Sequence, residues 1–175
     1  STMVSLSPDR TEVFITVLID EGKMYRVGDI KLSGRTLGQE KYLMDNIVIK
    51  PTEVFSNKKL QLSADKITQR MGDLGYAFAR VTPIPIKKPN SLVVDFDIRV
   101  EPGSRVYVRR INISGNAKTR DEVIRRELRQ LESSWYDADK IRLSRNRIDR
   151  LGYFQAVEMQ TKPLEETFDQ VDINV

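Results

Sequence analysis

The sequence predicts an α+β protein that contains tandem modules, each with the element order β-α-α-β-β. Each module is expected to form a three-stranded mixed sheet packed on two antiparallel helices. Two observations predict this fold. The chain repeats itself at a nearly fixed spacing, and in each copy apolar residues alternate as in strands near the ends and recur at helical spacing in the middle. With 175 residues, 39% of them hydrophobic, the chain is long enough to fill two small cores.

The repeat sets the expected boundaries of the modules. A strand that ends in Ser-Gly occurs at residues 33–34 and again 81 positions later, at 114–115. The spacing falls to 77 at the tripeptide Leu-Gly-Tyr, which stands at 74–76 and at 151–153, so the second copy lacks four residues. The sequence therefore predicts the last strand of a preceding module in 1–21, a complete module in 22–101, and a second module in 102–175 whose last strand is truncated. The short linker with Pro102 predicts closely coupled modules.

The first strand of each copy shows one change of phase. Apolar residues alternate up to Val27 and resume out of phase at Ile30, and the same happens between Val108 and Ile111. A change of phase at one place in both copies predicts a β-bulge.

Two helices are expected after this strand. In the second copy Thr119 and Glu122 have the spacing of a capping box, and Ile124, Leu128 and Leu131 follow along one helical face. A longer second helix is expected to begin at Ser56 in one copy and at Asp137 in the other. It is expected to end at Gly75 and Gly152.

Two strands complete each copy, and their edges differ in proline content. Pro83 and Pro85 lie two apart in the strand 81–86, which predicts an edge strand because proline cannot donate to the sheet. The corresponding strand of the second copy has no proline before Pro163, so it is the better candidate for β-augmentation by an unfolded strand. The alternative is an ordinary edge that charged side chains protect. The candidate edge strand comprises Ala156, Val157, Glu158, Met159, Gln160, Thr161 and Lys162.

The composition argues against an enzyme. The chain has no His and no Cys, which removes disulfides, thiolate nucleophiles and zinc sites with His or Cys ligands. No spacing of acidic residues indicates a calcium or acid-base site. We therefore expect no catalysis and no cofactor. The chain also lacks an apolar run long enough for a membrane-spanning helix, and residues 1–10 lack the layout of a signal peptide.

Positive charge is concentrated in the second copy. Between Arg105 and Arg150 there are 13 Lys or Arg and 7 Asp or Glu, whereas the net charge of the whole chain is +4. Such a surface suits anionic lipid headgroups or an acidic partner. The alternatives are a solvated helical face and an RNA-binding surface, although the aromatic residues expected between the arginines of an RNA binder are missing.

The order of motifs resembles the POTRA modules of the outer-membrane β-barrel assembly family. The motifs are the tandem β-α-α-β-β order, the strands that end in Ser-Gly, the segment Arg-Arg-Glu-Leu-Arg-Gln at 125–130, and Leu-Gly-Tyr-Phe at 151–154. By this resemblance 22–101 corresponds to the fourth module and 102–175 to the fifth, which lies nearest the membrane.

The resemblance implies a scaffold on the periplasmic face of the bacterial outer membrane. Such a scaffold receives unfolded outer-membrane proteins, docks accessory lipoproteins and reaches the membrane through a C-terminal barrel. It also implies that Glu127, with Arg126 and Arg129 beside it, contacts a cationic residue of the lipoprotein BamD. Two other functions stay open, an RNA-binding tandem protein and a POTRA pair of a related secretion or translocation pore.

Overall fold

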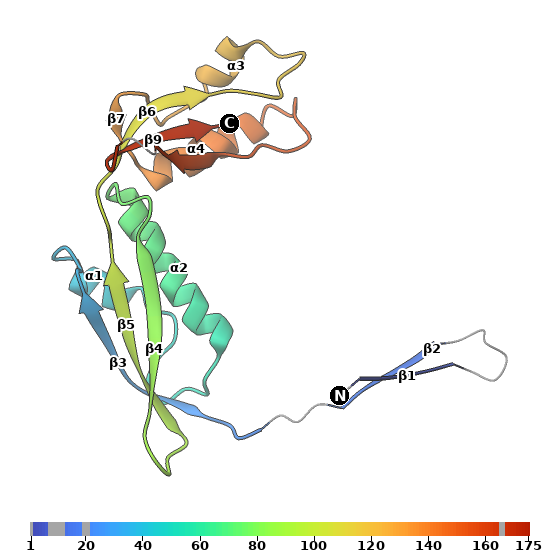
Figure 1. The fold of residues 1–175 in the computed structure, drawn as a ribbon, viewed down its shortest axis with the longest axis vertical. Helices are drawn as coiled ribbons and strands as arrows, with labels where there is room; N and C mark the ends of the chain where they lie inside the picture. Colours follow the sequence, from blue (N-terminus) through green and yellow to red (C-terminus); the bar gives the residue numbers. More distant parts are fainter. Residues whose placement is uncertain (1, 7–12, 19–21, 165–166) are drawn as a thin grey trace.

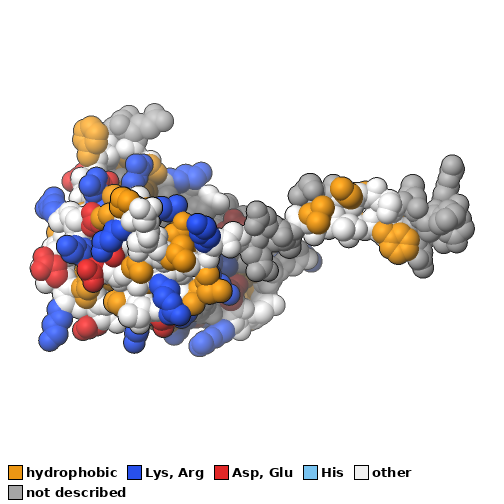
Figure 2. Space-filling model, turned by 90° about the horizontal axis from the view of Figure 1, so that it is seen from below, with side chains coloured by type: hydrophobic (Ala, Val, Ile, Leu, Met, Phe, Trp, Pro, Cys, Tyr) orange, Lys and Arg blue, Asp and Glu red, His pale blue; other side chains and the backbone are white. Residues whose placement is uncertain are grey.

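The computed structural model describes residues 2–6, 13–18, 22–164 and 167–175. Strands β1 (Thr2–Leu6) and β2 (Val13–Val17) form a separate antiparallel sheet. The sequence prediction of one strand in 1–21 was therefore incomplete, because the described part of this segment holds two paired strands. Val4, Phe14 and Ile15 of these strands are exposed. Figure 2 shows hydrophobic side chains at the surface of this part of the chain.

The first module has the predicted β-α-α-β-β order (Figure 1). Its sheet has the order β3-β5-β4, in which β3 pairs parallel and β4 antiparallel with the central β5. Strand β4, which carries Pro83 and Pro85, is an edge strand, as predicted. The elements are β3 (Arg26–Gly34), α1 (Glu40–Asp45), α2 (Asn57–Asp73), β4 (Arg80–Lys87) and β5 (Val93–Glu101).

The second module repeats this topology with one addition. Its sheet has the order β7-β6-β9-β8, in which β6 and β9 are parallel and the two-residue β7 extends the sheet beyond the predicted three strands. The elements are β6 (Tyr107–Asn112), α3 (Asp121–Arg125), β7 (Ser134–Trp135), α4 (Ala138–Asp149), β8 (Gln160–Pro163) and β9 (Gln170–Asn174).

Each sheet packs one face against its own helices and has its own core. In the first module the core includes Leu43 of α1, Ile67 of α2 and Ile98 of β5, all fully buried. In the second it includes Ile148 of α4 and Ile173 of β9. The apolar side chains on one face of each sheet therefore pack against the apolar face of each helix, as the periodicity predicts.

The predicted bulges are present in both modules, and an aspartate stabilises each one. The register shifts between Val27 and Ile30 and between Val108 and Arg110. In the first module Asp95 accepts the N–H of Asp29 at 2.9 Å. Hydrogen bonds from Lys88 and from that N–H hold the pKa of Asp95 below its usual value.

In the second module Asp172 takes the place of Asp95. Arg109 binds it through two nitrogens, at 2.9 and 2.5 Å, and the backbone of Arg110 also donates to it. These contacts, with Arg109 as the main cause, lower the pKa of Asp172. The bulge is thus fixed in the same way in both copies, although the charged neighbour differs.

A buried serine connects the helices of the first module. The hydroxyl of Ser63 in α2 accepts the N–H groups of Val48 and Ile49 at 3.0 and 3.4 Å and donates to the carbonyl of Lys59 at 2.8 Å. A hydroxyl has one hydrogen and two lone pairs, so all of its hydrogen-bonding capacity is used.

The second module contains the same arrangement at the same repeat spacing. Ser144 in α4 accepts the N–H groups of Arg129 and Gln130 at 2.7 and 3.4 Å and donates to the carbonyl of Lys140 at 2.7 Å. Both serines have no solvent-exposed surface. The segment that follows each short helix is therefore held against the long helix by one side chain.

The ends of the long helices agree with the prediction, whereas the first helix of the second module does not. Ser56 and Asp137 accept backbone N–H groups at the starts of α2 and α4. The predicted capping box was wrong, because α3 begins after Arg120 without a side-chain cap. Leu131 is 63% exposed, since α3 ends at Arg125 and the helical spacing does not continue.

The two modules are in direct contact where α2 ends and α4 begins. A Cβ atom on Gly72 would lie 2.9 Å from that of Ala138, and Val106 donates its N–H to the carbonyl of Gly75 at 2.9 Å. Asp73 lies in this junction, where burial and the negative charge of Asp139 raise its pKa. The predicted close coupling of the modules is confirmed.

Replacing Ser144 with Ala should destabilise the second module by about 1–3 kcal/mol, because two N–H groups near the core lose their acceptor. Ser63→Ala should have a similar effect on the first module. Urea unfolding followed by circular dichroism measures both. Asn146→Ala, on the exposed face of α4, serves as the control and should change the free energy of unfolding by less than about 0.5 kcal/mol. A loss as small in Ser144→Ala as in the control would contradict the role assigned to the serine.

Candidate functional site

The candidate edge strand is shorter than the sequence predicts. Strand β8 lies at the edge of its sheet, as expected, but it begins only at Gln160. The prediction was wrong for Ala156 to Met159, which lie outside any strand. Val157 is 6% exposed and packs into the core, so its side chain does not take part in an alternating strand pattern.

The segment before β8 lines a cavity of about 340 Å³. Phe154 and Val157 contribute apolar surface to it, together with Ile124 of α3 and Ile148 of α4. The predicted edge segment thus has two parts, a wall of an apolar cavity at 156–158 and a paired edge strand from Gln160.

The register of β8 shows which of its backbone groups point outward. Gln160 to Pro163 pair with Asn174 to Val171 of β9 in antiparallel register. Leu164 donates its N–H to β9, and Pro163 has no N–H to donate. Because alternate residues of an edge strand face the neighbouring strand, the N–H and carbonyl groups of Thr161 face outward. Thr161 also shares a side-chain hydrogen bond with Tyr136, whose pKa is raised chiefly by burial.

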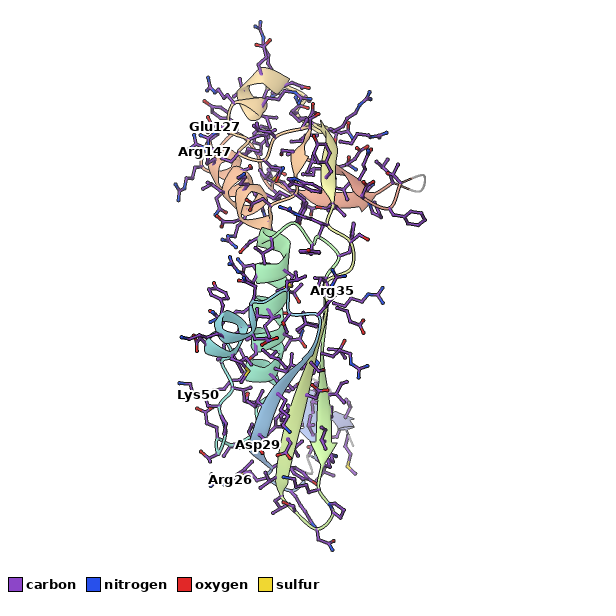
Figure 3. All side chains as sticks on the ribbon, turned by 90° about the vertical axis from the view of Figure 1, so that its left-hand side faces the viewer. Arg26, Asp29, Arg35, Lys50, Glu127 and Arg147 are labelled. Carbon is purple, nitrogen blue, oxygen red and sulfur yellow. The ribbon has the colours of Figure 1, made fainter. Side chains whose placement is uncertain are left out.

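Glu127, the predicted lipoprotein contact, is engaged within the module. Its Oε2 atom accepts from Arg147 of α4, with distances of 3.0 Å to Nε and 2.7 Å to the terminal nitrogen (Figure 3). Its Oε1 atom lies 3.6 Å from Nε of Arg126. The Glu127 side chain is 15% exposed, whereas that of Arg126 is 65% exposed. The strongest partner of Glu127 therefore comes from α4, twenty positions further along the chain.

Arg129, placed beside Glu127 by the sequence, has a different role. Its guanidinium donates to the carbonyls of Arg126 and Leu128 at 3.2 and 3.1 Å. It therefore caps the turn that carries Glu127 and does not bind the carboxylate. The structure thus brings the side chains of Glu127 and Arg126 together, whereas the side chain of Arg129 binds the backbone of the same turn.

The sequence did not predict the role of Gln130. This side chain has no exposed surface, accepts the N–H of Asp137 at 2.9 Å and donates to the hydroxyl of Ser134 and the carbonyl of Trp135. It ties the end of the Glu127 segment to β7 and to the start of α4. Its counterpart in the first copy, Ile49, is equally buried, and this unusual exchange of an apolar for a polar residue was the available signal.

Much of the positive charge in the second module is compensated within it. Arg109, Arg125, Arg142 and Arg147 form ion pairs with acidic side chains. These pairs hold four of the arginines against acidic side chains of the same module. No group of His, Cys, Asp or Glu suited to a metal ion occurs in the described residues. Among all the described residues of both modules, no helix is long and apolar enough to cross a membrane.

Residues 25–103 and 106–175 each match the POTRA family, described as a surface antigen variable number repeat. The chain is 37% identical over 175 residues to the outer membrane protein assembly factor BamA of Neisseria meningitidis, which covers 99% of this chain and 22% of that protein. It is also 26% identical over 170 residues to BamA of Buchnera aphidicola, and this alignment covers 97% of the chain and 28% of that protein. The chain thus spans about a quarter of the length of these curated relatives.

Two solved structures resemble the fold closely. BamA POTRA3-5 of Haemophilus influenzae has a TM-score of 0.92 and 27% sequence identity, with 99% of this chain and 69% of that chain covered. BamA of Haemophilus ducreyi lacking POTRA domains 1-3 has a TM-score of 0.72 and 32% identity, with 86% of this chain and 28% of that chain covered.

Proposed function

The chain belongs to the POTRA family, as its motifs predicted, and we propose that it is a periplasmic scaffold of outer-membrane protein assembly. One observation carries the proposal. Nearly the whole chain matches 69% of a BamA structure that comprises POTRA modules 3 to 5, with a TM-score of 0.92. The scaffold would work without covalent chemistry and reach the outer membrane through a barrel in the complete protein.

The scaffold binds unfolded β-barrel substrates by strand addition at β8. The outward N–H and carbonyl groups of Thr161 offer the main-chain partners that an extended strand needs, whatever its side chains are. The apolar cavity beside Val157 lies next to this edge and suits an apolar side chain of the same substrate. In the first module Pro83 and Pro85 reduce the donors that the matching edge can offer.

The scaffold docks a BamD-like lipoprotein at Glu127. Arg147 holds Oε2 of this carboxylate in place, and Oε1 lies at 3.6 Å from Arg126, too far for a strong hydrogen bond. A cationic side chain of the partner can therefore bind Oε1 without displacing Arg147. The exposed Arg126 offers a second charge to an acidic group on the partner, while Arg129 keeps the turn rigid.

Thr161→Pro tests the proposed substrate edge, because it removes an outward N–H and spares the bonds to β9. It should weaken binding of a urea-unfolded barrel protein by about fivefold, which corresponds to one hydrogen bond of about 1 kcal/mol. Thr161→Val, which keeps the N–H and loses the hydroxyl bonded to Tyr136, should bind normally. Fluorescence anisotropy measures both, and equal affinities of the two variants would exclude this edge.

Charge exchange tests the lipoprotein site. Glu127→Lys should lose the BamD-like partner and also lower stability by about 1–2 kcal/mol, since the lysine would face Arg126 and Arg147. Adding Arg147→Glu should restore stability by reversing the ion pair, but not the binding. Thermal unfolding and pull-down of the lipoprotein separate these effects. Recovery of binding together with stability would show that Glu127 acts only inside the module.

A further inference from the structure

In the second module, the outer edge of β6 is the side of this strand that faces away from β9. Two side chains close this edge beyond the short strand β7. Ile111 donates its N–H to Oε1 of Glu132 at 2.8 Å, and its carbonyl accepts from Arg125 at 3.1 Å. Arg125 and Glu132 also form an ion pair at 3.4 Å. This Arg125–Glu132 plug occupies the donor and the acceptor that an added strand would use.

Strand β3 occupies the same position in the first module. Its start is covered by the segment 52–55, since Val27 donates to the carbonyl of Glu53 and accepts from the N–H of Thr52. Val108 accepts in the same way from Ser133, the repeat counterpart of Thr52. The bulge follows in both strands, so Ile30 presents its backbone groups to the outer edge as Ile111 does.

The plug has no counterpart in the first module. The repeat spacing of 81 places Met44 where Arg125 stands and Pro51 where Glu132 stands. Neither side chain carries a guanidinium or a carboxylate, so neither can satisfy the backbone of Ile30 in this way. Among the described helices and strands, β3 makes extensive contact only with β5.

The surroundings of this edge suit an incoming strand. Met44 and Val54 are 43% and 46% exposed, so both offer apolar surface to a strand added here. Figure 3, which views the molecule from the side of β3, shows Arg26 and Asp29 near the start of the strand and Arg35 near its end. Arg26 and Arg35 thus place a cationic residue at each end of this edge.

We propose that the free edge of β3 at residues 30–32 binds an extended segment of an unfolded polypeptide by strand addition. The added strand would continue the sheet, with apolar side chains on the helix side near Met44 and Val54 and polar ones toward solvent. Acidic residues in it would complement Arg26 and Arg35. The inference rests on the strand-adding function proposed above, but assigns it to the other module and the other type of edge.

The experiment is a titration of the ¹⁵N-labelled chain with a spin-labelled peptide of about ten alternating valines and threonines that ends in aspartates. Binding should broaden the amide signals of Ile30 and Leu32 and leave that of Ile111 sharp. Met44→Arg with Pro51→Glu transplants the plug, and should reduce the broadening at Ile30 at least fivefold. The matched control is Met44→Leu with Pro51→Ala, which should bind as the original chain does.

The reverse variant opens the other edge. Arg125→Ala with Glu132→Ala should make Ile111 broaden with the same peptide, and the dispersion of the spectrum shows whether each variant is folded. Broadening at Thr161 alone would overturn the β3 site and leave the proposed function standing. Absence of broadening at both Ile30 and Thr161 would contradict both proposals. Broadening at Ile30 that Met44→Arg with Pro51→Glu does not reduce would show that the peptide does not bind through the outer edge of β3.

Discussion

The structure depends on one buried hydroxyl in each module. Ser63 and Ser144 each satisfy two N–H groups of the segment after the short helix and return a hydrogen bond to their own helix. Buried N–H groups without a partner are costly, so this segment has one low-energy position against the long helix. Apolar packing between the helices and the sheet then acts on a segment whose place is already fixed.

With the frame fixed in this way, the two modules are free to differ at their edges. Gln130 replaces Ile49 next to the serine and organises the strand β7 and the start of α4. The same part of the second module carries Glu127, whose partner Arg147 comes from α4. The difference between an open and a closed outer edge also arises here, from Met44 and Pro51 in one copy and Arg125 and Glu132 in the other.

The sequence predicted those features that depend on local pattern. The bulges at Val27 and Val108 and the caps at Ser56 and Asp137 follow from alternation and from residue type, and the structure confirms them. The extent of α3 and of β8 was predicted wrongly, because tertiary packing decides both. Val157 turns into the core, and Leu131 lies beyond the end of its short helix.

The candidate sites could be predicted only in part for the same reason. The sequence showed that Glu127 lies among arginines, but the residue that binds it is twenty positions away on another helix. The plug on β6 likewise joins residues from three elements or loops. Hydrogen bonds between distant segments have no periodic signal, whereas comparison of the two copies at spacing 81 does reveal where they differ.

The central claim is that one frame carries two kinds of outer edge, closed in the second module and open in the first. Amide hydrogen exchange of the free chain, followed by NMR, tests it most directly. The N–H of Ile111, donated to Glu132, should exchange at least about tenfold more slowly than that of Ile30. Equal rates at these two positions, or slower exchange at Ile30, would contradict the account.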